Sequence, residues 1–188
     1  MDVSDTGTRP APGRLALVQA FINTNDLDRG QDRLGTTDAA KNWFISCGLL
    51  SAGARVGRQD LDRIIAVREA LRALLAVDRS SAPGVRISEL EKVAASAKLT
   101  LRFDVADGIY LEPRSPGLSG ALGALLVICH VSAVDGTWFR LKACRNDECR
   151  WVFFDQSKNR ASKWCRPEIC GNRMRARAHR LRQASGPR

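Results

Sequence analysis

Four of the six cysteines stand close together near the end of the chain, in two pairs with the same spacing. Cys144 and Cys149 are separated by four residues, Cys165 and Cys170 are also separated by four, and 15 residues lie between the pairs. Tetrahedral Zn²⁺ takes four thiolate ligands, two from each of two tight turns. We therefore predict that these four cysteines bind one Zn²⁺ per chain. Two disulfides, or four unrelated thiols, are the alternative.

The cellular compartment decides between these alternatives, and the start of the chain resembles no export signal. Its first residues are acidic, Gln19 interrupts the apolar stretch from Leu15 to Ile22, and no small-residue cleavage site follows. We therefore expect a cytoplasmic protein. In that compartment clustered cysteines are metal ligands more often than disulfides.

The net charge of +10 is confined to the last quarter of the chain. Residues 1–139 contain 16 Lys and Arg and 16 Asp and Glu, whereas residues 140–188 contain 14 and 4. A neutral body with a strongly basic end indicates a polyanionic partner. Nucleic acid fits better than a membrane, because the basic segment has no long apolar face.

The residues that follow the last cysteine predict a basic helix, with Asn172 as its cap. At about 100° per residue, Arg173, Arg177 and Arg180 share one face of this helix. The other candidate nucleic-acid contacts lie elsewhere on the helix or in the loop between the cysteine pairs: Arg175, Arg182, Lys158, Arg160 and Lys163. Like charges four residues apart disfavour a free helix, and bound phosphates would relieve their repulsion. A solvated basic face is the alternative interpretation.

Before the basic segment, apolar periodicity predicts a mainly helical domain over residues 14–135. Residues 1–13 have almost nothing to bury and predict a disordered leader. Helices are expected near residues 15–22, 37–50 (capped by Thr37), 57–78 and 87–97, with a polar loop over 23–33 and a break at 80–84. Residues 99–111 alternate with a period of 2 around Asp107-Gly108, which predicts a β-hairpin.

The apolar stretch at residues 118–134 is 17 residues long, the lower limit for crossing a bilayer. Its small and polar residues, including Gly120, Gly123 and Ser132, suit a helix buried inside a protein. We expect such a core helix, with Ser115 as its cap and His130 in the core.

Residues 138–183 are expected to form the zinc module, with short strands near 139–143 and 151–154. The predicted fold class is mainly α (α+β): a helical N-terminal domain with one β-hairpin, followed by a small treble-clef or ribbon-like zinc finger with a basic C-terminal helix. The module is too small for a large core and needs the metal for stability. The helical domain is expected to fold without it.

Residues 140–180 resemble the CGNR-type zinc finger. That family is named for a tetrad that stands here as Cys170, Gly171, Asn172 and Arg173, and it also has a strand before the first cysteine, an apolar-aromatic run after the second, a Trp-Cys pair and a basic terminal helix. The preceding part, with its LVQAFINTND segment and long helix, resembles the ABATE domain that accompanies this finger in bacterial stress-induced transcription regulators. The resemblance implies zinc binding by the four cysteines, DNA binding and a regulatory role.

The sequence thus predicts a transcription regulator that binds duplex DNA through a four-cysteine zinc finger. Its helical domain would sense a small-molecule effector or form a homodimer, and no membrane partner is expected. A zinc module that binds RNA or an acidic protein is the alternative. An enzyme is disfavoured, because four cysteines close the metal shell and the two histidines are far apart in sequence.

Overall fold

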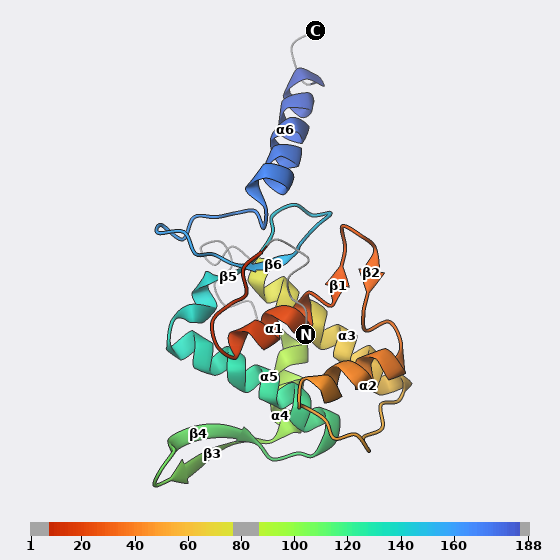
Figure 1. Ribbon diagram of the computed structural model, residues 1–188, viewed down its shortest axis with the longest axis vertical. Coiled ribbons are helices and arrows are strands. Elements are labelled where there is room, and N and C mark those ends of the chain that lie inside the picture. The colour runs from red at the N-terminus through yellow and green to blue at the C-terminus, as the bar shows by residue number, and fades with distance from the viewer. Residues whose placement is uncertain (1–7, 77–86, 185–188) are drawn as a thin grey trace.

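The computed structural model describes residues 8–76 and 87–184, which contain six α-helices and three two-stranded sheets (Figure 1). The helices are α1 (Leu15–Ile22), α2 (Thr37–Ser46), α3 (Arg58–Ala76), α4 (Ser88–Ala97), α5 (Gly117–Val134) and α6 (Asn172–Ala184). The antiparallel strand pairs are β1 (Asn25–Asp26) with β2 (Gln31–Asp32), β3 (Leu99–Asp104) with β4 (Gly108–Pro113), and β5 (Leu141–Ala143) with β6 (Val152–Phe154). These elements confirm the predicted α+β class, dominated by helices.

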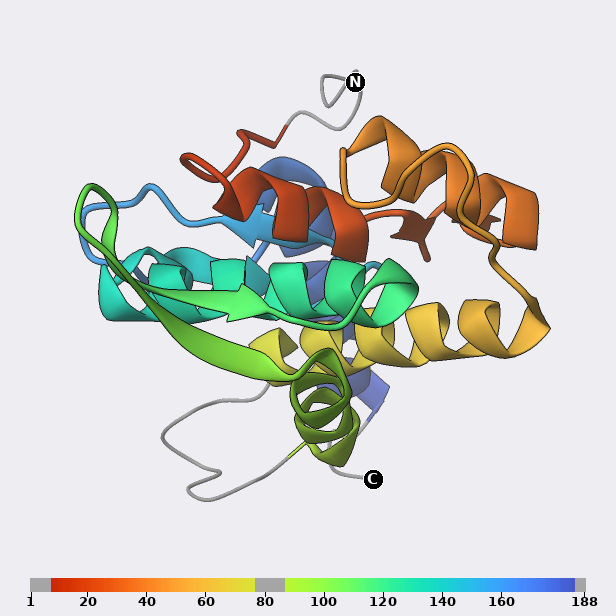
Figure 2. The same cartoon turned by 90° about the horizontal axis from the view of Figure 1, so that it is seen from below.

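Helices α1, α3 and α5 meet in the centre of the molecule, where they lie side by side (Figure 2). Phe21 of α1, Ile64 of α3 and Leu122 of α5 are completely buried. The Phe21 ring also lies 5.4 Å from Trp43 and 5.8 Å from Phe44, which attaches α2 to the same core. Burying a side chain of this size stabilises the fold by about 1.5–3 kcal/mol, so this cluster is the main source of stability in the helical part.

Among the described residues, α5 is the helix that is long and apolar enough to cross a membrane. It nevertheless contacts α1, α3, α4 and β4. A Cβ atom on Gly123 would lie 2.5 Å from the Ala97 Cβ and 3.0 Å from the Pro113 Cβ, so the missing side chain lets α4 and the base of the hairpin approach α5. These contacts are those of a core helix in a folded protein. His130, which we expected in this core, is exposed.

Several predicted helix ends are wrong by a few residues. Thr36, not Thr37, caps α2, because its hydroxyl accepts the Ala39 N–H at 3.2 Å. Helix α2 ends at Ser46 and does not reach residue 50. Ser115 does not cap α5, since its hydroxyl donates to the Ser96 carbonyl. The expected end of α3 at residue 78 and the break at 80–84 lie outside the described residues.

The predicted hairpin is confirmed, with Leu101 opposite Leu111 and Phe103 opposite Ile109. The polar loop expected over residues 23–33 contains a second, very short hairpin, β1–β2. In the finger, the strand expected from residue 139 begins two residues later, because a 3₁₀ turn, η2 (Thr137–Arg140), occupies its start.

Residues 8–13 of the predicted disordered leader have defined contacts. The Gln19 side chain accepts the Ala11 N–H at 2.6 Å, and Ala11 is buried. The Trp151 indole donates to the Thr8 hydroxyl at 3.2 Å. This part of the leader therefore lies along α1 and reaches the finger, while residues 1–7 are outside the described part of the chain.

The core of the helical part continues into the first strands of the finger. Leu141, Ala143 and Val152 are buried in the same cluster as the helices, and β5 packs on α3. The Asn23 side chain adds hydrogen bonds of 2.8 Å to both the N–H and the carbonyl of Val152. Independent folding of residues 14–135 stays a prediction. A chain that ends at residue 136 would expose this shared apolar face to water.

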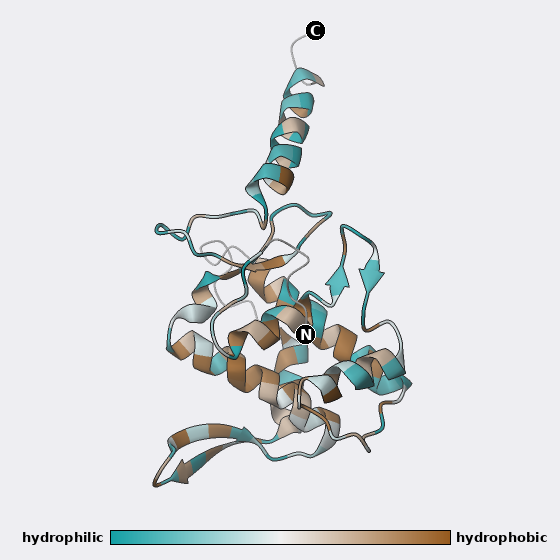
Figure 3. Ribbon diagram, in the orientation of Figure 1, coloured by the Kyte–Doolittle hydropathy of each residue, from teal (hydrophilic) through white to brown (hydrophobic). Residues whose placement is uncertain are grey.

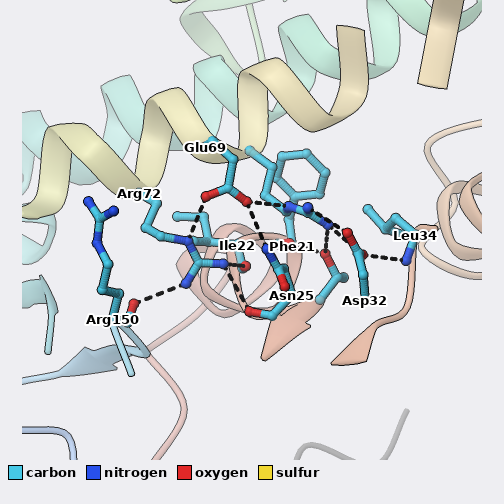
Figure 4. A network of polar contacts seen from close by, with 10 residues as sticks. Phe21, Ile22, Asn25, Asp32, Leu34, Glu69, Arg72 and Arg150 are labelled. Atoms are coloured by element: carbon cyan, nitrogen blue, oxygen red, sulfur yellow. Dashed lines mark hydrogen bonds and ion pairs between the residues drawn. The ribbon is translucent and has the colours of Figure 1, made fainter. Parts of the chain in front are cut away.

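Two buried arginines of α3 hold the β1–β2 hairpin against the body (Figure 4). Arg68 makes a bidentate bond of 2.7 Å to each oxygen of Asp32, and its Nε lies 2.9 Å from Glu69. Burial alone would raise the pKa of Asp32, but hydrogen bonds from Arg68 and the Leu34 N–H outweigh it and lower that pKa. Burial would also raise the pKa of Glu69, but the charge of Arg72 outweighs it and lowers that pKa. Both carboxylates stabilise the fold as anions, and this contribution falls as the pH drops through their folded-state pKa values.

Arg72 extends this network to the finger. Its guanidinium donates to the carbonyl oxygens of Ile22 at 2.7 Å, Asn25 at 3.0 Å and Arg150 at 3.0 Å, and its Nε bonds Glu69 at 3.0 Å. The side chain is only 1% exposed. A single buried cation thus joins α1, strand β1 and the segment after Cys149.

We predict that Arg72→Ala lowers the free energy of unfolding by about 3 kcal/mol, because it leaves buried carbonyl oxygens without donors. Urea denaturation measured by circular dichroism checks this value. Arg58→Ala is the matched control on the same helix, since the Arg58 side chain is 84% exposed and should change stability by less than about 0.5 kcal/mol. Equal stabilities for the two variants would contradict the role given to Arg72.

Candidate metal centre and nucleic-acid interface

The sulfur atoms of Cys144, Cys149, Cys165 and Cys170 gather at one point of the finger, all within 4.8 Å of one another. The Cys149 and Cys165 sulfurs lie 3.6 Å apart, and those of Cys165 and Cys170 lie 3.7 Å apart. Tetrahedral zinc with Zn–S bonds of about 2.3 Å separates its sulfurs by about 3.8 Å. A disulfide would need about 2.05 Å. The four thiols are free, so the disulfide alternative is wrong and the geometry fits one metal ion.

Asn146 organises the first turn and explains why a gap of four residues suits it. Its backbone N–H donates to the Cys144 sulfur, and its carbonyl accepts the N–H groups of Cys149 and Arg150, both at 2.9 Å. Its Oδ1 accepts the Glu148 N–H at 3.3 Å, and the side chain is buried. The residues between the two cysteines therefore wrap around Asn146, and the sulfur atoms of Cys144 and Cys149 still converge.

The second turn is built around the carbonyl of Arg166. This oxygen accepts the N–H groups of Ile169 at 3.2 Å and Cys170 at 2.8 Å within the π-helical turn η3 (Pro167–Gly171). A Cβ atom on Gly171 would lie 3.1 Å from the Trp164 ring, so glycine lets the indole cover the cluster closely. The turn then continues directly into α6.

The acid–base behaviour of Cys144, Cys149 and Cys165 favours a bound cation. A hydrogen bond from Cys149, with a second from Cys165, lowers the pKa of the Cys144 thiol to about 2. The hydrogen bond to Cys144 in turn raises the pKa of Cys149 to about 12, and a like hydrogen bond raises that of Cys165. Among these three cysteines, the thiolate form is thus favoured at Cys144 alone. Four thiolates at these positions need a cation, and Zn²⁺ would hold the two turns together as a structural ion.

Asp155 fixes the loop between the cysteine pairs. Its side chain has no exposed surface and accepts the Lys142 Nζ at 2.7 Å, the Ser157 N–H at 2.9 Å and the Ser162 N–H at 3.0 Å. Burial opposes the ionised form, but these bonds outweigh it and lower the pKa of Asp155. The carboxylate therefore ties the loop to β5. Sequence analysis missed it because two of its partners, Lys142 and Ser162, lie 13 and 7 residues away.

Helix α6 projects from the body, and none of its residues is buried (Figure 1). Its surface is mostly hydrophilic (Figure 3). Arg173, Arg177 and Arg180 line one groove of about 300 Å³, which Asn146 and Glu148 of the first turn also border. The structure thus brings together the three arginines that were predicted to share a face.

Two of the predicted contacts near the start of α6 have partners within the chain. Arg173 forms an ion pair of 2.6 Å with Asp28 in the β1–β2 loop. Arg175 donates to the Asn172 Oδ1 at 2.5 Å and is not among the residues of the groove. Asn172 is the first residue of α6 rather than its cap, because the preceding π turn continues into the helix and the Asn172 amide donates to the Glu168 carbonyl. Arg182 is exposed near the end of α6.

The basic residues of the loop lie on a different surface from the groove. Arg160 and Lys163 line a second cavity of about 390 Å³ together with Lys142 and Arg145, and Lys158 is exposed nearby in sequence. Sequence analysis did not select Lys142 and Arg145. The signal for Lys142 was the alternation of basic and apolar residues in the strand that leads into Cys144. Arg145 follows Cys144 and had no such signal.

Comparison with protein families gives two matches that together cover most of the chain. Residues 15–135 match the ABATE family, described as "Putative stress-induced transcription regulator", and residues 140–183 match the CGNR zinc finger. A search of curated proteins gives no match. The second match contains all four clustered cysteines, which is consistent with one Zn²⁺ per chain.

We predict that the purified protein contains one zinc per chain and that Cys165→Ser lowers this content, because three thiolates bind zinc more weakly than four. Metal analysis by mass spectrometry checks the stoichiometry. Cys129→Ser, which changes a thiol outside the cluster, is the control and should retain the metal. A native protein without zinc, with two disulfides in the finger, would contradict this prediction.

We predict that Asn146→Ala lowers zinc affinity roughly 10- to 100-fold, because the buried side chain that bonds the Glu148 N–H inside the first turn is lost while all four ligands remain. Competition with a chromogenic chelator measures the affinity. Asp147→Ala is the control next in sequence, where the side chain is exposed. If both variants bind zinc equally well, Asn146 does not position the ligands.

Proposed function

This chain belongs to the ABATE family and ends in a CGNR zinc finger, and on that basis we propose that it is a cytoplasmic transcription regulator that binds duplex DNA through the finger. The observation that carries this proposal is the groove along α6. Three arginines that are not adjacent in sequence face the same space beside the metal cluster. Their spacing suits successive phosphates or a phosphate and a base edge.

The position of the charge supports a nucleic-acid partner. None of the residues of helix α6 is buried, and no acidic residue occurs within it. The second basic cavity, with Arg160 and Lys163, widens the positive surface around the finger. Contacts of this kind to the DNA backbone bring affinity and orientation, and most of them do not select sequence.

Two other functions have less support. A finger that recognises structured RNA or an acidic protein would use the same charges, and competition of RNA against duplex DNA for the full-length protein distinguishes these partners. A catalytic role would need a metal with an open position, whereas four converging thiols leave none. We therefore assign the metal a structural role.

The helical part would control the finger in response to a small-molecule effector. A surface cavity of about 360 Å³ lies between Leu15 of α1, Ile128 of α5 and Thr137 of η2. Because η2 leads directly into β5 and Cys144, a molecule bound there would contact the connection to the finger. The lining is mostly apolar but includes the charged Arg14 and Asp135, which suits a small, mostly apolar ligand that carries a polar group.

We predict that replacing Arg173, Arg177 and Arg180 together with Ala weakens binding to duplex DNA by at least tenfold. Each lost phosphate contact flattens the plot of log affinity against log salt concentration by about 0.9, so loss of all three should reduce the slope by about 2.7. Fluorescence anisotropy over a series of salt concentrations measures both quantities.

The control for this experiment is a triple Ala variant at Arg33, Arg55 and Arg58, three exposed arginines of the helical part. Arg68 and Arg72 cannot serve as controls, because they are buried and support the fold. Equal losses of affinity in the two triple variants, with zinc content unchanged, would show that the α6 groove is not the DNA surface.

A further inference from the structure

The start of helix α1 and the end of helix α5 meet at one cavity. The two helices lie side by side and run in opposite directions (Figure 2). The cavity has a volume of about 360 Å³ and is lined by residues 12–15 of the first segment and by residues 128, 131, 132, 135 and 137 of the second. Sites for small molecules usually measure about 300–1,000 Å³. The cavity therefore suits a ligand of the size of a single amino acid.

Two opposite charges border this cavity and do not pair with each other. Arg14 directly precedes α1, and Asp135 directly follows α5. Neither side chain forms an ion pair within the described part of the chain. Hydrogen bonds from the hydroxyl and the N–H of Thr137, both to the Asp135 Oδ1, lower the pKa of Asp135 and keep it an anion. A cation and an anion are thus both available to a ligand.

Each of these charges stands at the helix end that disfavours it. The start of a helix carries partial positive charge and its end partial negative charge, yet Arg14 lies at a start and Asp135 at an end. A neutral Asn would accept the bonds from Thr137 equally well, so the turn does not explain the charge of Asp135. Such departures from local preference are typical of functional sites. An anionic group beside Arg14 and a cationic group beside Asp135 would relieve both.

We propose that this cavity binds a free α-amino acid with an apolar side chain. Its carboxylate would bond the Arg14 guanidinium, and its ammonium group would bond Asp135. Its side chain would lie on the apolar lining, which Leu15, Ile128 and the half-exposed Val131 provide. A carboxylic acid or an amine would use only one of the two charges, and an uncharged molecule would use neither. This inference rests on the effector role proposed above and names the chemical class of the effector.

Isothermal titration calorimetry of the full-length, zinc-loaded protein without DNA tests the class of ligand. The probes are L-leucine, L-isoleucine, L-valine, L-methionine and L-phenylalanine, of which at least one should bind at one site per chain. The acid that lacks its amino group and the amine that lacks its carboxylate should each bind at least about tenfold more weakly, because each loses one charged contact. No binding by any of the five amino acids, or equal binding of the amino acid and its two analogues, would overturn the proposal.

Two variants that each remove one charge test the assigned residues. Arg14→Gln removes the cation, and Asp135→Asn removes the anion while it keeps an acceptor for Thr137. Each should weaken binding of the amino acid by about tenfold or more. Arg58→Gln is the control, because the Arg58 side chain is 84% exposed and lies outside the cavity. Arg14 and Asp135 variants that bind the amino acid as tightly as the control would overturn the assignment.

Fluorescence anisotropy of a labelled DNA duplex, with and without the bound amino acid, separates this inference from the proposed function. A change in DNA affinity that both cavity variants abolish supports an effector at this site. If the amino acid binds but DNA affinity stays the same, the effector role is wrong and the ligand assignment stands. If DNA binds and none of the amino acids does, the ligand assignment is wrong and the proposed DNA binding stands.

Discussion

The buried guanidinium of Arg72 is the interaction on which the junction between the helical part and the finger depends. It bonds carbonyl oxygens in α1, in strand β1 and at Arg150, directly after the second cysteine. Arg150 has a φ of +46°, a left-handed conformation that costs free energy in a residue other than glycine. Its N–H bonds Asn146 and its carbonyl bonds Arg72. The strained residue is thus held from both parts, and the metal turn acquires a fixed orientation relative to α3.

Two different sources of stability meet within the finger. Its first half, strands β5 and β6, contributes Leu141 and Val152 to the core of the helices and is stabilised by apolar burial. Its second half has little to bury beyond Trp164 and the cysteines, so the metal and the Asp155 hydrogen bonds must hold it. The two family matches meet between residues 135 and 140, but the apolar core runs through that boundary. Sequence families and folding units therefore need not coincide in this chain.

The features that could be predicted from sequence are those set by local spacing. The duplicated cysteine gap predicted the cluster, the period of 2 around Asp107-Gly108 predicted the hairpin, and apolar periodicity predicted most helices. What could not be predicted depends on partners distant along the chain. Arg68 and Arg72 look like ordinary surface charges of α3 until Asp32 and Arg150, 36 and 78 residues away, are in place. The same holds for Arg173, whose partner Asp28 is 145 residues away, and for residues 8–11, which pack against distant groups.

The ion pair between Arg173 and Asp28 relates the orientation of α6 to the proposed DNA binding. A helix of 13 residues with no buried side chain is marginal in water, and its repeated arginines repel one another. Asp28 neutralises the first of these charges and ties the start of α6 to the body. An exposed pair of this kind is weakened by water and salt, so a DNA phosphate can replace the carboxylate at small cost. The helix would then already be oriented before DNA binds. No free energy of ordering would be lost on binding, and the affinity would be higher for that reason.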